Sequence, residues 1–125
     1  MVKEYKHINL IGDSITTLVT RDKKKDIEIT GLTLCNVHES DTVYVDIFLR
    51  DLVQPEVESN RTNWDEVEDE FIDLYIMKNI EITSMNTLIL EPREIDYDSR
   101  VYDLMIQLNT ASSKVDVMIN FKKEK

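Results

Sequence analysis

The sequence has few of the residues that punctuate or cross-link a chain: one cysteine, two glycines and two prolines among 125 residues. A lone cysteine cannot form an internal disulfide, and so little glycine and proline excludes collagen-like and low-complexity chains. No stretch approaches the roughly eighteen apolar residues of a membrane-spanning helix. With 42% hydrophobic and 32% charged residues, the composition is that of one globular domain covering residues 1–125.

Positive charge is also scarce, because 25 acidic residues outnumber 15 basic ones and give a net charge of −10. Such a surface repels phosphate backbones, so we expect no nucleic-acid partner. The amino-terminal residues lack the apolar core of a signal peptide. We therefore expect a chain made in a reducing cytoplasm, with no membrane association.

What the sequence has in abundance is the alternation of apolar and polar residues that is typical of β-strands. The clearest examples are residues 43–50, VYVDIFLR, and residues 115–122, VDVMINFK. Gly31 interrupts another such run and suggests a bulge or a close backbone approach. About eight strands are expected; the further candidates are residues 14–19, 26–35, 71–76, 78–82, 86–90 and 102–108.

Turn-forming residues separate these strands at intervals of about ten residues, which favours a sandwich or barrel. We expect an all-β fold, an antiparallel β-sandwich of immunoglobulin-like or jelly-roll-like type with about seven to nine strands. Residues 1–12 are expected as an extended arm. The predicted core, taken from the apolar faces of the alternating runs, is Val45, Ile47, Leu74, Ile76, Leu104, Ile106, Val117 and Ile119.

The longest break in the strand pattern is a long acidic insertion at residues 51–70, which carries the only tryptophan, Trp64. Residues 63–71 of this stretch could alternatively form one or two helical turns. Between residues 55 and 75, eight acids stand against Arg61, a net charge of −7, whereas residues 1–25 carry six bases and three acids, a net charge of +3. The acidic segment of one copy and the basic segment of another could therefore attract each other across an interface.

Candidate catalytic and metal sites find little support. Cys35 could act as a nucleophile only with His7 or His38, and the chain turns between Cys35 and His38. We interpret Cys35 as a small core residue and both histidines as surface residues. Zinc spacing and glycine-rich phosphate loops are absent. We predict no catalytic residues, no cofactor and no metal; calcium is the open alternative, through Asp65, Glu66, Glu68, Asp69 and Glu70.

Several large side chains lie on the outward faces of the predicted strands, namely Tyr44, Phe48, Tyr75 and Met118. Either a neighbouring subunit or a loop of the same chain would cover them. Trp64 could anchor a partner or fold back over the end of the sandwich. The candidate interface residues are Lys23, Lys24, Lys25, Tyr44, Phe48, Trp64, Asp65, Glu66, Glu68, Asp69 and Glu70.

Residues 27–37, IEITGLTLCNV, and 41–47, DTVYVDI, resemble a group of small virion proteins of tailed bacteriophages, especially contractile-tailed ones. The resemblance continues through residues 74–82, LYIMKNIEI, and 86–90, NTLIL, and ends with residues 114–119, KVDVMI. It covers most of residues 14–121. The chain departs from the group at residues 83–85, TSM, where proline and glycine are common, and in its longer acidic insertion.

The resemblance implies a non-enzymatic structural protein of the phage virion, made in the host cytoplasm and located in the head, neck or tail. It implies self-association into a homo-oligomer and binding to a neighbouring capsid or tail protein. The alternative is a β-sandwich module that binds carbohydrate or a host surface through Trp64 and nearby acids. For the assembly protein, we expect the acidic segment of residues 56–70 to face Lys23, Lys24 and Lys25 of a neighbouring copy.

Overall fold

The computed structural model describes residues 2–53 and 70–124, which form eight strands and one short 3-10 helix. The elements in chain order are β1 (Val2–Ile11), β2 (Thr16–Val19), β3 (Ile27–Asn36), β4 (Val43–Val53), β5 (Glu70–Ile82), β6 (Thr87–Leu90), η2 (Pro92–Glu94), β7 (Asp103–Leu108) and β8 (Lys114–Lys123). All pairings are antiparallel, and the strands form two four-stranded sheets. The expected all-β sandwich is confirmed.

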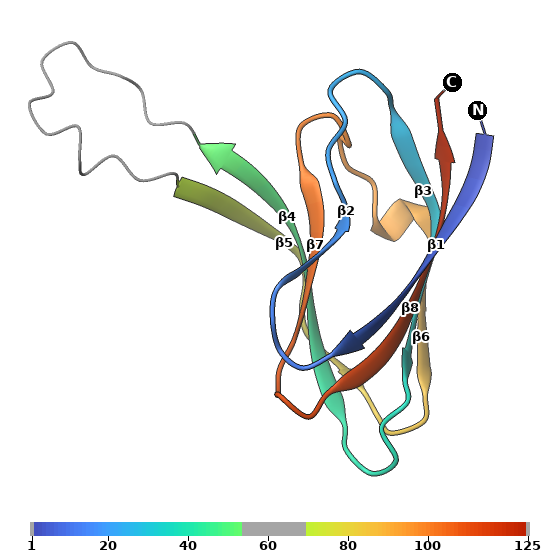
Figure 1. Cartoon of the computed structure of the whole chain (residues 1–125), viewed down its shortest axis with the longest axis vertical. Helices are drawn as coiled ribbons and strands as arrows, with labels where there is room; N and C mark the ends of the chain where they lie inside the picture. Colours follow the sequence, from blue (N-terminus) through green and yellow to red (C-terminus); the bar gives the residue numbers. More distant parts are fainter. Residues whose placement is uncertain (1, 54–69, 125) are drawn as a thin grey trace, which may run out of the picture.

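The strand order is β1-β8-β3-β6 in one sheet and β2-β7-β4-β5 in the other (Figure 1). Strand β1 pairs with β8, β2 with β7, β3 with β6 and β4 with β5. These four pairs form one long antiparallel ribbon, with the β4–β5 connection at its tip. The ribbon is wound on itself, so that β3 also pairs with β8 and β4 also pairs with β7. Of the two expected sandwich types, this arrangement is the jelly roll.

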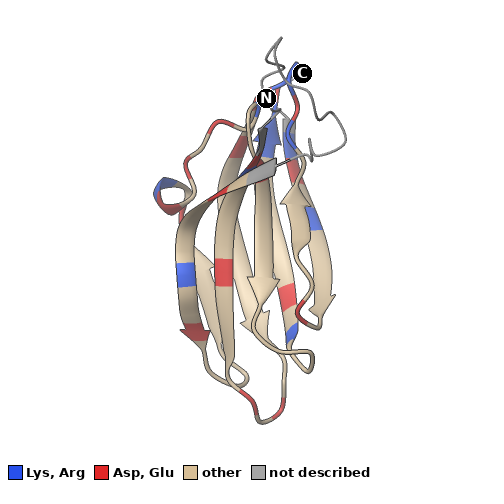
Figure 2. Ribbon diagram, turned by 90° about the vertical axis from the view of Figure 1, so that its left-hand side faces the viewer, with Lys and Arg blue, Asp and Glu red and all other residues tan. Residues whose placement is uncertain are grey.

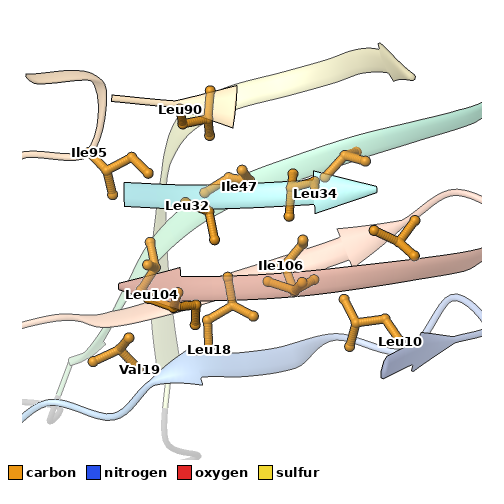
Figure 3. Close-up of a cluster of buried hydrophobic side chains, with 14 of the residues drawn as sticks. Leu10, Leu18, Val19, Leu32, Leu34, Ile47, Leu90, Ile95, Leu104 and Ile106 are labelled. Atoms are coloured by element: carbon orange, nitrogen blue, oxygen red, sulfur yellow. The ribbon is translucent and has the colours of Figure 1, made fainter. Parts of the chain in front are cut away.

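The core lies between the two sheets and consists almost entirely of aliphatic side chains (Figure 3). Leu32 and Leu34 from β3 meet Leu104 and Ile106 from β7, and all four are fully buried. Strand β4 contributes every second residue, Val43, Val45, Ile47 and Leu49, because successive side chains in a strand point to opposite faces. Six of the eight predicted core residues are buried: Val45, Ile47, Leu104, Ile106, Val117 and Ile119.

Residues 1–12, expected as an extended arm, instead contain the edge strand β1. It pairs with β8 without any shift of register along its length. Among the side chains of β1 that the structure describes, Ile8 and Leu10 contact the core, whereas residues 3–7 are exposed. The alternation is weak here because an edge strand has few neighbours to pack against, and this hid the strand in the sequence.

Residues 71–76 and 78–82, expected as two strands, belong to the single strand β5, which contains two bulges. Lys78 and Asn79 lie opposite Asp46 alone, and Asn79 has a positive φ of 55°. Ile76 has no residue opposite it. Each bulge shifts the alternation of inward and outward residues by one position. The bulges could not be recognised from the sequence pattern, so one strand was predicted as two.

The prediction that Leu74 belongs to the core is wrong, because this side chain is 46% exposed. Leu74 pairs with the buried Leu49, so it has the expected orientation. However, β4 and β5 extend beyond the sandwich at this point, as the upper left of Figure 1 shows. Ile76 is half-buried against the core.

The predicted bulge at Gly31 is confirmed, because the β3–β8 register shifts between Ile29 and Gly31. The expected insertion at residues 51–70 begins later, since residues 51–53 continue β4 and Glu70 opens β5. Residues 54–69, including most of the possible helical turns, lie outside the described residues; Glu70 and Phe71 belong to β5.

These packing differences predict different costs for two leucine truncations. Leu104→Ala should lower the free energy of unfolding by about 2–4 kcal/mol, because it leaves a cavity in the closed core. Leu74→Ala should lower it by less than about 1 kcal/mol, because water already reaches this side chain. Denaturant unfolding of the two variants measures both values. Equal losses would contradict the assignment of Leu74 to the projecting hairpin.

Candidate interaction surface

The outer face of the β2-β7-β4-β5 sheet carries an aromatic cluster centred on Phe48. Phe48 lies opposite Met105 of β7 on one side and Tyr75 of β5 on the other. The rings of Phe48 and Tyr75 are 5.2 Å apart at a tilted angle, and Arg50 covers Phe48 with its guanidinium carbon 5.4 Å from the ring centroid. Phe48 is therefore only 1% exposed, and it is not the accessible interface anchor that the sequence suggested.

A network of charged side chains continues this cluster toward the tip of the ribbon. The Arg50 guanidinium donates two hydrogen bonds to the Asp73 carboxylate, Nε to Oδ1 at 2.7 Å and Nη2 to Oδ2 at 3.0 Å. This contact raises the pKa of Arg50 above its ordinary value. Arg21 joins the network by donating to Asp51, at 3.2 Å, and to Asp103, at 3.4 Å. The charged groups are satisfied within the chain.

Beyond this network, the ends of β4 and β5 form a hairpin that projects from the sandwich, and we call its described part, residues 50–53 and 70–75, the arm (Figure 1). Ile72 and Leu74 are 48% and 46% exposed. They lie two residues apart in β5 and therefore point to the same side, the side that faces the core further along the sheet. This side of the arm thus carries two apolar side chains that the described part of the chain leaves open to water, next to Asp51, which lies opposite Ile72.

The basic residues Lys23, Lys24 and Lys25 are exposed in the β2–β3 connection. Asp22 holds this connection, because its carboxylate accepts hydrogen bonds from the backbone N–H groups of Lys24 and Lys25. The hydrogen bond from Lys24 is the main cause that lowers the pKa of Asp22. Figure 2 shows further basic residues of the strands near the two termini, with acidic residues among them.

The connection that carries these lysines contacts the start of the arm through Arg21. Arg21, in the same connection, donates to the backbone carbonyl of Arg50 and to Asp51, where the arm begins. The structure therefore brings the β2–β3 connection and the start of the arm together through Arg21. Tyr44 lies elsewhere, because it sits at the opposite end of β4, where it is 40% exposed.

The remaining predicted interface residues cannot be placed in the same way. Trp64, Asp65, Glu66, Glu68 and Asp69 lie outside the described residues, and Glu70 opens β5. The pairing of the acidic segment with Lys23, Lys24 and Lys25 of a neighbouring copy stays a prediction. Within residues 2–53 and 70–124, no group of three or more histidine, cysteine or acidic side chains is placed to hold a metal ion. The calcium alternative lies mostly outside these residues.

Cys35 is half-buried in β3, next to Leu34 and Asn36, which are both buried. It therefore lies on the outer face of its sheet, and the interpretation as a core residue is wrong. His7 is exposed, as expected. His38 is half-buried and organises the β3–β4 connection, where its Nδ1 accepts hydrogen bonds from the backbone N–H groups of Ser40 and Asp41.

Asn36 is a fully buried polar residue at the end of β3, and its role was not predicted from the sequence. Its side-chain amide donates to the backbone carbonyls of Asp41 and Ile82, each at 2.9 Å, and its Oδ1 accepts from the backbone N–H of His38 at 3.0 Å. One side chain thus joins β3, the following connection and the end of β5. The signal available beforehand was only an asparagine at a strand end, which is common in turns.

Compared with known proteins, the chain matches no protein-family model and no curated sequence. Among the residues that the structure describes, no helix is long and apolar enough to cross a membrane.

Replacing Asn36 tests its role as a buried connector. Asn36→Ala should lower the free energy of unfolding by about 1–3 kcal/mol, because it leaves the buried Ile82 carbonyl without its donor. Asn9→Ala, at an exposed position of β1, is the matched control and should change stability by less than about 0.5 kcal/mol. Thermal or denaturant melts measure both. Similar stability of the two variants would show that water replaces the amide.

The Arg50–Asp73 pair should stabilise the start of the arm. Asp73→Ala removes the acceptor of both guanidinium hydrogen bonds, and it should lower the free energy of unfolding by about 1–2 kcal/mol. Asp96→Ala, at an exposed position with no ion pair in the described part of the chain, should change it by less than about 0.5 kcal/mol. If both variants melt like the unmodified protein, the pair contributes nothing measurable.

Proposed function

We propose that this chain is a non-enzymatic structural protein of a bacteriophage virion, which self-associates and binds a neighbouring capsid, neck or tail protein. The arm carries this proposal. It holds Ile72 and Leu74 away from the sandwich on a side that the second sheet does not reach. A partner with an apolar surface would bury both side chains and gain the free energy of removing them from water.

The surroundings of the arm support an assembly role. Arg50 and Asp73 neutralise each other at its start, so a partner would not have to desolvate an unpaired charge there. Lys23, Lys24 and Lys25 lie in the connection that contacts the start of the arm and would favour an acidic rim on the partner, which would orient the encounter. Jelly rolls occur in viral capsid proteins, although a fold alone does not assign a function.

The sequence resemblance supports the same proposal independently of the arm. Its motifs lie mainly in β3, β4, β5, β6 and β8, the strands that build most of the sandwich. The proposed function therefore depends on binding surfaces of the sandwich rather than on catalytic residues. Location in the virion follows as part of this proposal.

The direct test is to purify phage particles from host cells that produce this chain and to quantify it by mass spectrometry against the major capsid protein. We expect the chain to sediment with the particles, in many copies for each particle. A chain that stays wholly in the unsedimented protein would contradict the proposal.

Variants of the arm sharpen the test. The double variant Ile72→Ser with Leu74→Ser should melt within a few degrees of the unmodified protein and lose at least about tenfold in copies per particle, because about 100 Å² or more of apolar contact is removed. The control double variant, Met85→Ser with Ile89→Ser, changes two exposed apolar residues away from the arm. Equal incorporation of both double variants would exclude the arm as the contact.

The carbohydrate-binding alternative was predicted at Trp64 and nearby acids, and Trp64 lies outside the described residues. Within the described residues, a different place favours it. A hollow of about 580 Å³ lies on the β1-β8-β3 surface beside the exposed Tyr5, with Thr30 and Asn120 among the residues that line it. An aromatic ring next to hydroxyl and amide groups could hold a sugar. Saturable binding to an oligosaccharide array that disappears in Tyr5→Ala, together with absence from particles, would favour this alternative.

A further inference from the structure

Each sheet of the sandwich has two edge strands, and they differ in how readily another chain could pair with them. The edges are β1 and β6 in one sheet and β2 and β5 in the other. Strands β2 and β6 have four residues each, and β5 carries two bulges. Short length and bulges are common ways to protect a sheet edge. Strand β1 has ten residues and no register shift, so it is the open edge among those described.

The hydrogen bonds at the end of β1 define which backbone groups point outward. The Gly12 N–H donates to the Ser113 carbonyl of the connection before β8. Because alternate residues of an antiparallel strand face the same neighbour, the even-numbered residues of β1 face β8. The N–H and C=O groups of Lys3, Tyr5 and His7 therefore point away from the sheet.

This outward edge is accessible. Every residue from Lys3 to His7 is exposed, and Tyr5 reaches 77%. The inner side of the strand holds two opposite charges, Glu4 and Lys6. Lys6 reaches across the sandwich to donate its Nζ to the Leu18 carbonyl of β2 at 3.3 Å, which leaves its other two N–H donors free of that contact.

The charges select one register for pairing between two copies of β1. Only registers that place odd residues opposite odd residues let the outward groups bond. Pairing Tyr5 with Tyr5 places Glu4 opposite Lys6 at two symmetric positions. If the two-fold axis passes through Glu4 instead of Tyr5, Glu4 lies opposite Glu4; if it passes through Lys6, Lys6 lies opposite Lys6. Like charges directly opposite each other are destabilising.

We infer that the partner of this edge is a second copy of the chain, joined by antiparallel β1–β1 pairing about a two-fold axis at Tyr5. The two β1-β8-β3-β6 sheets then form one continuous sheet across the dimer. On the outer face, the two exposed Tyr5 rings become cross-strand neighbours, and Lys3 lies opposite His7. Backbone hydrogen bonds and the tyrosine contact hold the dimer, while the charges fix its register.

This inference deepens the proposed function, since it rests on that proposal for the expectation of self-association and names the surface that provides it. The arm remains available in such a dimer for the neighbouring virion protein, because it belongs to the other sheet.

Charge reversal tests the register in purified full-length protein by sedimentation equilibrium. Glu4→Lys and Lys6→Glu each replace two attractive contacts with two repulsive ones, and each should raise the dimer Kd by about tenfold or more. Mixing the two variants restores an opposite pair at both positions, so heterodimers should form with a Kd near that of the unmodified protein. Glu39→Lys, at an exposed residue of the β3–β4 connection, is the charge-matched control.

A backbone variant tests the edge itself. Tyr5→Pro removes an N–H that points away from β8, so the monomer should fold and melt almost unchanged, whereas dimer formation should be lost. Thermal melts of the variants verify that the fold is retained, including in Lys6→Glu, which loses the bond to Leu18.

The remaining outcomes are decisive. If the unmodified protein dimerises and all of these variants dimerise equally well, the edge pairing is wrong, although self-association stands. If the protein is still monomeric at about 100 µM, its dimer Kd is too high for a lasting dimer, and the inference is overturned. The particle-content experiment still tests the virion role in both cases.

Discussion

Burial of aliphatic side chains between the two sheets is the interaction on which the rest of the structure depends. Leu18, Leu32, Leu34, Leu104 and Ile106 are fully buried there, and each reaches the core only if its strand keeps the correct phase. A shift by one residue would turn the apolar side of a strand outward. The wound antiparallel ribbon satisfies this constraint for all eight strands, and the bulges in β3 and β5 adjust the phase where the sequence has an extra residue.

The same constraint explains why the arm differs from the body. Along β4 and β5, the inner side continues beyond the point where the opposite sheet ends, so Ile72 and Leu74 meet water there, with Asp51 opposite Ile72. The outer side of these strands shows the reverse: Phe48, Arg50 and Asp73 satisfy one another within the chain. An inner side without a second sheet, rather than the outer aromatic cluster, is therefore the surface with most to gain from a partner.

The proposed assembly role requires that the chain allow one association and resist others. Three of its sheet edges are short or bulged, while β1 is long and regular, with Glu4 and Lys6 adjacent to its open backbone groups. Charged residues on an edge oppose most pairings and permit a complementary one. An edge and an arm in different sheets would let one domain form two separate contacts, which suits a component repeated within a particle.

The sequence by itself determined the all-β class, most strand positions, the bulge at Gly31 and six of the eight predicted core residues. It could do so because alternation and turn residues act over a few neighbouring positions. Only the tertiary structure decided that residues 2–11 form an edge strand, that residues 70–82 form one bulged strand, and that Asn36 is a buried connector. It also decided that Phe48 is covered and Leu74 is exposed. These outcomes depend on which strands lie opposite and where the second sheet ends, and a periodic pattern within one strand carries no information about either.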